Sequence, residues 1–432
     1  MATITLDTAI DWSTSASSDI EAAITEAGVN GTVLFPAGEY RITEPIVPLA
    51  GQTLAGEGYE STVLRIDFAA IDNFANMSLI RKNESNGVTL NPGVTVVGFT
   101  IDGGRDQCGR PNYETGPDCP YGAGGGVSLG IGWTLSRCRL TNLNGAKTGC
   151  FGAHGARIEY CVWDNDDGGT GGDQDNIGGG GVTNLWLVGN TFAENCAGSG
   201  IDITTGADIH LINNKIGYRS LILEGIQGAE VRANLIYRSA VDSDAGGINI
   251  KSNTAYASAE QAGAWCSTDV VVEGNTIINS YNPGIIVSST WDDKGPGDVK
   301  DAGRYGQAKG IVVRDNTIVS PYGLGIYAGG QDRARADSHV AIYQNIIVDP
   351  REATAGLGDE WNSGAGYFAC AGVGIGSGNQ LLVARNLVLR TSTDSAQAVA
   401  LVDGARGGSS KVVSTRAYQN SVSTVADTAM AT

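Results

Sequence analysis

The sequence lacks the features that would direct it to a membrane or to nucleic acid. It contains no run of about 18 apolar residues, so it predicts no membrane-spanning helix. Its 28 Lys and Arg are outnumbered by 46 Asp and Glu, which gives a net charge of -18 at pH 7. Nucleic-acid binding needs a basic surface, so we expect no nucleic-acid partner. The first residues show neither a basic start nor an apolar stretch, and so do not resemble a signal peptide.

Cysteine is present but not in the spacing of a zinc site. None of the eight cysteines forms a Cys-x-x-Cys pair or a Cys/His cluster. Cys108 and Cys119 lie in one polar segment, where a disulfide is plausible. Cys138 and Cys161 occupy equivalent positions after two apolar runs, so we expect them to stack on each other, as buried thiols in preference to a bridge. Pro is scarce, and no change of composition marks a linker, so we expect one domain over residues 1–432.

The sequence does have a repeated motif. An alternating apolar run is followed by Asn, one further residue and an apolar residue, as in LWLVGNTF. The runs are short and rich in Val, Ile and Leu, which predicts strands. A motif that recurs at a period of roughly 20 residues or more indicates a stacked repeat architecture. The motif places its asparagines at Asn190, Asn214, Asn234, Asn275, Asn316, Asn345 and Asn386.

An Asn at one fixed position of every repeat has a physical reason. Stacked coils lie about 4.8 Å apart, so an Asn in a turn can bond backbone groups and its own copies in the coils above and below. Asn also tolerates a bent backbone. With 63 glycines available for tight corners, the sequence predicts an all-β fold: a single-stranded, right-handed parallel β-helix. We expect about ten coils between residues 94 and 420.

A short helix is expected ahead of the coils. Residues 18–28 carry apolar side chains at Ile20, Ala23, Ile24 and Ala27, which is the spacing of an amphipathic helix. Ser18 or Asp19 would cap its start and Gly28 its end. A solenoid needs its open end covered, so we interpret this helix as an N-terminal cap.

The N-terminal segments resemble a known superfamily. The order DIEAAITEA, VLFPAGEYRI, LAGEG and STVL resembles the start of the pectate-lyase-like right-handed β-helix superfamily. That group contains polygalacturonase-like hydrolases, polysaccharide lyases, inulin fructotransferases and phage tailspike depolymerases. The resemblance implies the fold and a glycan as partner, but it leaves the reaction open because the superfamily hosts several chemistries.

A second strand with the pattern Gly-Ile-x-Ile is expected in each coil. Alternate side chains of such a strand point outward. Long insertions, among them 102–125, 164–181 and 349–371, would rise beside it as loops. We therefore expect a solvent-exposed groove with a polar centre. Its outward residues would be Ser128, Asp202, Thr204, Ile222, Glu224, Asn249, Lys251, Ile286, Ser288 and Tyr327.

Asp202 and Glu224 are the candidate catalytic residues. They are expected on neighbouring coils with their stems roughly 8 Å apart, a separation that suits an acid and a base in inverting glycoside hydrolysis. The stretch that carries them also resembles the carboxylate-bearing coils of inulin fructotransferases. The alternative is that both are solvated carboxylates and that Glu224 is paired with Lys251. Functionally, Lys251 would contact the sugar, or act as the base of a lyase.

The acidic loop 164–176 leaves three interpretations open. Its oxygen-rich side chains and glycines suit Ca²⁺, although the spacing matches no known calcium loop. Asp173 or Asp175 could instead contact substrate or take part in catalysis beside Asp202. The third interpretation is a polar, turn-rich loop without a function of its own. The favoured mechanism requires no cofactor or metal.

Further substrate contacts are expected from the edge of the groove and from the loops. His154 would orient substrate at the edge. Aromatic faces and Arg side chains bind sugars well, and large aromatics in polar loops call for an explanation. Packing and surface charge are the alternative roles. The candidates are Tyr218, Arg219, Arg238, Trp265, Trp291 and Trp361.

Together these patterns predict a carbohydrate-active enzyme that cleaves glycosidic bonds, either a glycoside hydrolase or a fructotransferase-like enzyme. One alternative is a calcium-assisted polysaccharide lyase or uronate epimerase. Another is a non-catalytic, glycan-binding phage tail or adhesin β-helix. We expect a monomer or a homotrimer, located outside the cell or on a virion.

Overall fold

A computed structural model of the chain divides into two compact units, Met1–Asp202 and Ile203–Thr432, and each is described by itself. The described residues are 1–7, 15–67, 78–85, 88–104, 125–143, 147–164, 175–194, 196, 200–217, 219–237, 246–252, 266–280, 283–289, 308–330, 337–351, 371–375, 378–379, 381–390, 397–401, 412–413 and 416–424.

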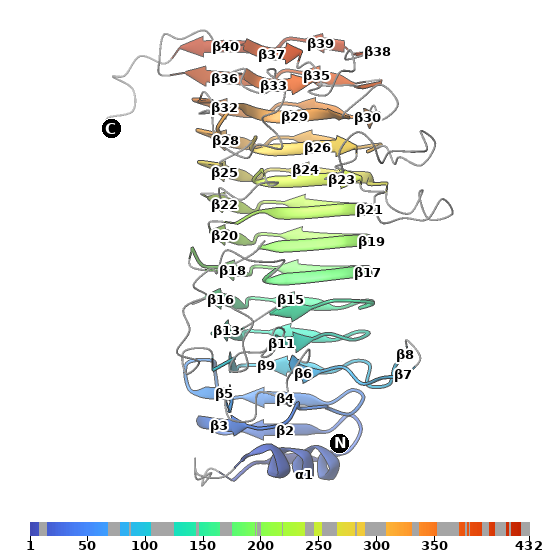
Figure 1. The fold of residues 1–432 in the computed structure, drawn as a ribbon, viewed down its shortest axis with the longest axis vertical. Helices are drawn as coiled ribbons and strands as arrows, with labels where there is room; N and C mark the ends of the chain where they lie inside the picture. Colours follow the sequence, from blue (N-terminus) through green and yellow to red (C-terminus); the bar gives the residue numbers. More distant parts are fainter. Residues whose placement is uncertain are drawn as a thin grey trace, which may run out of the picture. The chain divides into compact units, whose positions relative to one another are not determined.

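In the first unit the chain winds through three stacks of parallel strands (Figure 1). Stack 1 contains β6 (Ser78–Arg81), β11 (Gly125–Ser128), β14 (Thr148–Gly149) and the start of β17 (Ile177–Val188). Stack 2 contains β1 (Thr3–Thr5), β2 (Thr32–Phe35), β4 (Thr53–Gly56), β9 (Thr95–Val97), β12 (Thr134–Ser136), β15 (Arg157–Glu159) and the end of β17. Stack 3 contains β3 (Gly38–Ile42), β5 (Thr62–Ile66), β10 (Thr100–Asp102), β13 (Arg139–Thr141), β16 (Val162–Asp164) and β18 (Thr191–Phe192).

The second unit repeats the three stacks. Stack 1 contains the start of β21 (Leu221–Arg232), β23 (Ile248–Ser252), β26 (Ile285–Ser289), β29 (Leu324–Gly330), β33 (Ala371–Ile375) and β37 (Gln397–Leu401). Stack 2 contains the end of β21, β24 (Thr268–Glu273), β27 (Val312–Arg314), β31 (Ala341–Tyr343), β35 (Leu382–Ala384) and β39 (Arg416–Tyr418). Stack 3 contains β20 (Lys215–Gly217), β22 (Leu235–Tyr237), β25 (Thr276–Ile278), β28 (Thr317–Val319), β32 (Ile346–Val348), β36 (Leu387–Arg390) and β40 (Ser421–Thr424).

Five short strands and one long one complete the set. β7 (Glu84–Ser85) and β8 (Val88–Thr89) form an antiparallel pair in the first unit. In the second unit β30 (Asp337–Ser338) and β34 (Gly378–Asn379) pair in parallel, and β34 also pairs with β38 (Val412–Val413). β19 (Ile201–Ile212) begins with the last two residues of the first unit.

Alternation of side chains builds the core of each unit. In stack 2 of the first unit, Val33, Leu54, Val96 and Leu135 occupy one register column and are all fully buried. Nearby, the ring of Trp163 stacks on that of Phe192 with centroids 4.6 Å apart. Such inward columns of apolar residues in parallel register are the core of a parallel β-helix. The predicted fold class is therefore confirmed.

Two details of the predicted organisation differ from the structure. Parallel stacking in the first unit already includes β2 at Thr32, well before residue 94. The predicted loop 164–181 ends earlier than expected, because Ile177–Gly181 belong to β17. The glycine-rich sequence there suggested a loop, but ladder hydrogen bonds such as Cys150 N–H to Gly178 O, at 2.8 Å, extend the strand through it.

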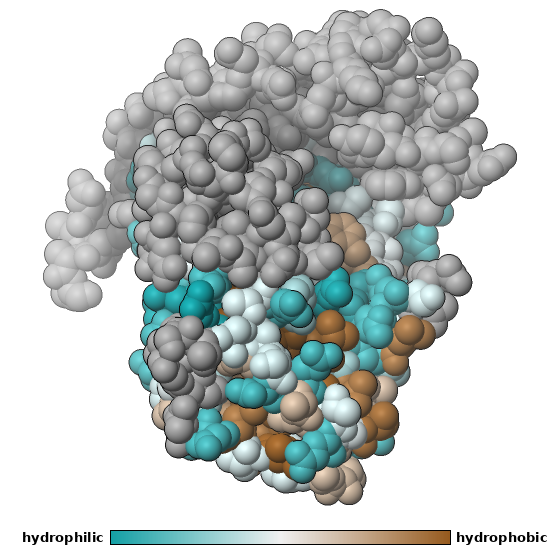
Figure 2. Space-filling view, turned by 60° about the horizontal axis from the view of Figure 1, so that its bottom comes forward, coloured by the Kyte–Doolittle hydropathy of each residue, from teal (hydrophilic) through white to brown (hydrophobic). Residues whose placement is uncertain are grey.

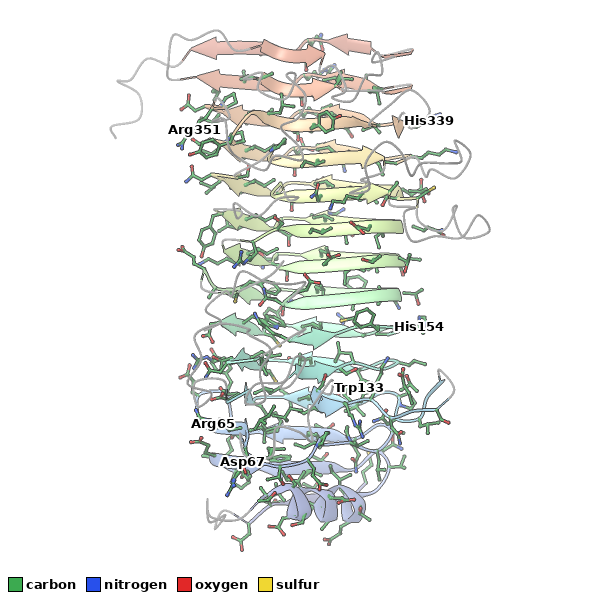
Figure 3. The ribbon with its side chains drawn as sticks, viewed as in Figure 1. Arg65, Asp67, Trp133, His154, His339 and Arg351 are labelled. Carbon is green, nitrogen blue, oxygen red and sulfur yellow. The ribbon has the colours of Figure 1, made fainter. Side chains whose placement is uncertain are left out.

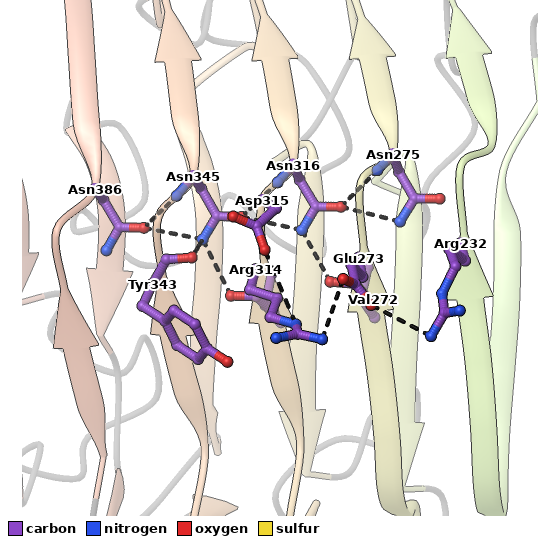
Figure 4. Close-up of polar contacts among 11 residues, drawn as sticks. Arg232, Val272, Glu273, Asn275, Arg314, Asp315, Asn316, Tyr343, Asn345 and Asn386 are labelled. Carbon is purple, nitrogen blue, oxygen red and sulfur yellow. Dashed lines mark hydrogen bonds and ion pairs between the residues drawn. The ribbon is translucent and has the colours of Figure 1, made fainter.

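The predicted Asn positions form a continuous hydrogen-bonded ladder in the second unit (Figure 4). Asn316 is representative: its Nδ2 donates to Asn345 Oδ1 at 3.0 Å and to Val272 O at 2.9 Å. Its Oδ1 accepts the backbone N–H and the Nδ2 of Asn275, both at 2.9 Å. The ladder runs through Asn214, Asn234, Asn275, Asn316, Asn345, Asn386 and Asn420.

In the first unit the same position holds two cysteines and then Asn190. The Cys138 N–H donates to Cys161 Sγ at 3.5 Å, and the Cys161 N–H donates to Asn190 Oδ1 at 3.0 Å. Both cysteines are free and fully buried, so the prediction of stacked, buried thiols is confirmed. Burial and the neighbouring Cys138 raise the pKa of Cys161 well above its usual range.

The corner that carries this ladder has a constant length. In the second unit two residues separate each stack 2 strand from the next stack 3 strand, as between Glu273 and Thr276 or between Tyr343 and Ile346. The first of the two residues takes a left-handed backbone conformation, with φ of 56° at Asp315. That conformation is unfavourable for most side chains, and the bonds of the following Asn stabilise it.

The helix α1 (Ser17–Ala27) lies at one end of the first unit and contacts β1 and β2. It buries Ile20, Ala23, Ile24 and Ala27, as predicted, and ends at Gly28. In Figure 2 this end of the first unit is turned forward, and hydrophilic residues are interspersed with hydrophobic ones on it.

The start of α1 differs from the prediction. Its N-cap is Ala16, not Ser18 or Asp19, and the N–H of Ser17 donates to Ser15 Oγ at 3.1 Å. The hydroxyl of Ser17 instead accepts the N–H of Thr43 at 2.9 Å, so this serine joins the helix to the first coil. None of the helices in the described part of the chain is long and apolar enough to cross a membrane.

Candidate functional site

The outward positions of stack 1 in the second unit align as the sequence predicted. Asn249 pairs in register with Ile222 on one side and with Ile286 on the other, and Ile286 pairs with Tyr327. One further column begins at Glu224, which pairs with Lys251. The candidate residues of this unit are therefore brought together on consecutive strands.

These outward side chains are not exposed to solvent, which corrects the expectation of an open polar groove. Asn249 and Ile286 have no exposed surface, and Tyr327 is 2% exposed. Every residue of β23 is buried, so both faces of this strand are excluded from water. The apolar side chains of Ile222 and Tyr327 at outward positions are the sequence signal for a covered face.

Glu224 and Lys251 form an ion pair within this buried surface. Lys251 Nζ lies 3.4 Å from Glu224 Oε1, and the two side chains are only 5% and 15% exposed. The predicted pairing of Glu224 with Lys251 is thus confirmed. Nearly buried charges are expensive to desolvate, and an apolar pair of similar volume is often as stable. Such a pair therefore marks a candidate functional position.

Ser267 holds the strand that carries Lys251. Its hydroxyl donates to the Lys251 carbonyl and accepts the N–H of Ile226 at 3.2 Å. Its own N–H donates to Ser252 Oγ at 2.8 Å. These bonds connect the end of β23 to the bend in β21, just after Glu224. The ion pair is consequently fixed by backbone contacts on both of its strands.

Asp202 lies at the end of the first unit and is half-buried. The Ile177 N–H donates to Gly200 O at 3.2 Å, which sets the segment leading to Asp202 beside the start of β17. Glu224 belongs to the other unit, so the predicted separation of about 8 Å between the two stems stays a prediction.

A second set of polar residues lies along stack 1 of the first unit. Lys147 is fully buried and its Nζ donates to Asn176 Oδ1 at 2.5 Å. Asp175 is half-exposed, and its Oδ2 lies 3.3 Å from the position that a Cβ on Gly178 would occupy. Asn176 was predicted only as part of the acidic loop 164–176, and Lys147 was not predicted as a site residue. The sequence signal for Lys147 was a lone Lys directly before a Thr- and Gly-containing strand, Thr148–Gly149.

His154 lies at the lateral edge of the first unit (Figure 3). It is exposed, and its Nδ1 lies 2.6 Å from the hydroxyl of Thr183, its partner in a parallel bridge. Arg219 is half-exposed and directly precedes the buried Ser220 at the start of β21. Neither placement tests the role in substrate binding, which stays a prediction for both residues.

The other predicted contacts fall outside the described residues. These are Tyr218, Arg238, Trp265, Trp291 and Trp361, together with residues 165–174 of the acidic loop and the pair Cys108 and Cys119. Among the residues that the structure does describe, no group of three or more His, Cys, Asp or Glu side chains is placed to hold a metal ion.

Thiol chemistry does not fit the described part of stack 1. Cys150 follows β14 and is fully buried, and burial raises its pKa to about 12. A nucleophilic thiol needs an accessible thiolate. The groups described above that remain for chemistry are carboxylates, two lysines and amides.

The comparisons with known proteins identify the fold. The family model described as rhamnogalacturonase A/epimerase, pectate-lyase-like, matches residues 5–102. No curated protein matches the sequence. The surface adhesin PfbA of Streptococcus pneumoniae is 11% identical with a TM-score of 0.60, over 99% of this chain and 93% of the adhesin.

Two further structures show the same arrangement. The catalytic domain of a GH87 alpha-1,3-glucanase, solved in complex with nigerose, is 15% identical with a TM-score of 0.55, over 95% of this chain and 68% of the glucanase. Gene product 12 of bacteriophage phi29 is 13% identical with a TM-score of 0.55, over 97% of this chain and 51% of the phage protein. At this identity the likenesses show a shared fold, and one fold carries several functions.

Proposed function

We propose that this chain, which has the parallel β-helix fold of the pectate-lyase-like superfamily, is a carbohydrate-active enzyme. It would cleave glycosidic bonds of a polysaccharide or oligosaccharide bound at Glu224, the more exposed member of the ion pair in stack 1. One observation carries the proposal: the Glu224–Lys251 ion pair is nearly buried on the outward side of the stack. A β-helix requires apolar residues inward, but nothing in its architecture requires a buried charge pair outward.

The carboxylates supply the chemistry of the proposed reaction. Hydrolysis with inversion uses one carboxylic acid to protonate the leaving oxygen and one carboxylate to activate water. Glu224 has a cation 3.4 Å away, which favours the role that needs a negative charge, so we assign it the activation of water. Asp202 belongs to the first unit, and its role as the acid that protonates the leaving oxygen stays a prediction from the sequence. Lys251, which is nearly buried, would orient Glu224.

The first experiment is a product assay over neutral and uronate glycans. Release of reducing ends, or of a cyclic product without them, supports the proposal. Glu224→Gln and Asp202→Asn should each reduce turnover by at least a hundredfold while the far-UV circular dichroism is unchanged. Glu230→Gln is the matched control, because Glu230 lies on the same strand, β21, but in stack 2. Near-normal turnover of Glu224→Gln would refute the assignment of the carboxylate.

A second candidate function is non-catalytic glycan binding. The observation in its favour is the likeness to a surface adhesin over nearly the full length of both chains. In this case the wild-type protein would bind members of the glycan panel and release no product. Such a protein would be expected on a cell surface or a virion, as a monomer or a homotrimer.

The assay also separates a third possibility, a calcium-assisted lyase or uronate epimerase. A lyase produces unsaturated uronates, which absorb in the ultraviolet, and dependence on calcium would make this absorbance disappear with a chelator. An epimerase changes the uronate composition without new chain ends. Either result would replace the hydrolytic assignment and would direct attention to Lys251 as the base.

A further inference from the structure

Nothing in the described part of the structure requires Gly149 to be glycine. It lies in β14, pairs in register with Ser128 and Gly178, and does not have a positive φ. Among the residues that the structure describes, a Cβ at this position would meet only one neighbouring atom within 4 Å, the Cδ2 of Phe151 at 3.8 Å, which is an ordinary contact. Glycine weakens a strand, and one that packing does not require often marks the close approach of a ligand.

Phe151 lies beside this glycine and is 60% exposed. Its backbone is fixed: its carbonyl accepts Lys82 Nζ, and the next residue, Gly152, donates its N–H to Gly180 O at 2.9 Å. The ring, however, stands largely in water. An exposed aromatic ring on a fixed backbone, next to a strand position without a side chain, has the form of a stacking surface for a sugar ring.

Small residues continue across consecutive coils. Ser128, Gly149 and Gly178 pair in register, at about 4.8 Å per coil. The carboxylate of Asp175 lies over Gly178, 3.3 Å from the position of a Cβ on that glycine. A flat floor is thus bordered by an aromatic ring, with a hydroxyl at one end of the column and a carboxylate at the other.

We propose that Phe151, Gly149 and Asp175 form a binding subsite for a neutral pyranose ring in the first unit. The apolar face of the sugar stacks on Phe151, Gly149 leaves room for the ring, and Asp175 accepts hydrogen bonds from hydroxyls. A uronate is disfavoured because its carboxylate would approach that of Asp175. The subsite rests on the glycan binding proposed above, but it is independent of catalysis at Glu224.

The test measures dissociation constants by isothermal titration calorimetry. The full chain with Glu224→Gln, which prevents cleavage, is titrated with neutral gluco-, manno- and fructo-tetrasaccharides and with tetragalacturonate. Phe151→Ala should weaken the binding of the best neutral ligand by roughly tenfold. Gly149→Val should weaken it at least as much without lowering the melting temperature, because Val fills the floor but suits a strand.

Tyr160→Ala is the matched control, since Tyr160 is a comparably exposed aromatic, at 55%, beside Gly189 and away from this floor. It should leave the dissociation constant within about twofold of the parent. The subsite is refuted if Phe151→Ala binds as the parent does, if Gly149→Val binds normally or unfolds at a lower temperature, or if the parent binds no neutral tetrasaccharide.

The result is separable from the fate of the proposed function. Loss of affinity in Phe151→Ala, together with absence of turnover by the wild type, keeps the subsite and makes the protein a glycan-binding module. Turnover that depends on Glu224, together with unchanged affinity in Phe151→Ala, keeps the enzyme and rejects the subsite.

Discussion

Replacing Asn316 by Ala should strongly destabilise the second unit. The substitution removes two bonds donated by Nδ2 and two accepted by Oδ1, all between 2.9 and 3.0 Å, at a fully buried position. The buried N–H of Asn275 then loses its acceptor, which costs about 1–3 kcal/mol, and the remaining bonds add about 2 kcal/mol in sum. We therefore expect the free energy of unfolding to fall by about 3–5 kcal/mol.

Guanidinium denaturation followed by circular dichroism measures this loss. Asn420→Ala is the matched control: it also removes a bond to a strand carbonyl, that of Val383 at 3.0 Å, but its bonds are only partly buried. Water can replace them, so the loss should be less than half as large. Asn316→Cys should be intermediate, because Cys161 accepts the Cys138 N–H in the equivalent position of the first unit.

The reasoning would be refuted if Asn316→Ala lowered the free energy of unfolding by less than about 1 kcal/mol, the worth of a single ordinary hydrogen bond. It would also fail if Asn420→Ala cost as much as Asn316→Ala. Either result would mean that the ladder follows from the stacking of coils and does not stabilise it.

Three further predictions concern other buried polar groups. Lys251→Met should lower the free energy of unfolding by about 3–5 kcal/mol because it removes the cation that lies 3.4 Å from the nearly buried Glu224 carboxylate. The double variant Glu224→Leu/Lys251→Met should recover most of this loss in urea titrations, and a double variant no more stable than the single one would contradict the reasoning. Burial raises the pKa of Cys150 in the folded protein to about 12 from 9.0, so the thiol loses its proton at a lower pH in the unfolded chain than in the folded one. The free energy of unfolding should therefore be unaffected by this thiol below about pH 9 and should fall between about pH 9 and pH 12. Cys150→Ala should make the urea midpoint less dependent on pH in this range. Gln52→Ala removes the hydrogen bonds that Nε2 donates to Ile24 O at 2.7 Å and to Gly28 O at 2.9 Å. The free energy of unfolding should fall by about 2–4 kcal/mol, and the amide hydrogens of α1 should exchange faster. Unchanged amide exchange would show that the helix does not depend on these bonds.

The sequence contained enough information for the fold because one corner repeats without change. Asn at that corner bonds its own copies, so selection for the ladder leaves a periodic signal. Asn420 was missed because the strand before it, Arg416–Tyr418, has polar and aromatic residues where the other repeats have an apolar run. Cys138 and Cys161 occupy the same corner position in the first unit, with a thiol in place of the Asn amide.

The candidate site was less accessible from sequence. Alternation correctly predicted which residues share an outward column, including Glu224 with Lys251. It did not predict that Lys251 is 4% exposed, since alternation describes the strand itself and not what lies over it. Gly149 could not be predicted as a site residue for a related reason. Many glycines in this chain lie at corners, and only the structure distinguishes them from a glycine within a strand.

The constant two-residue corner makes the β-helix modular. Because the step from stack 2 to stack 3 never changes in the second unit, the registration of coils does not depend on how much chain is spent elsewhere. Asn214 and Asn234 are separated by 20 residues, whereas Asn234 and Asn275 are separated by 41, and the same bonds form in both cases. Segments of very different length can thus be exchanged at the other corners while the Asn ladder keeps consecutive coils in register.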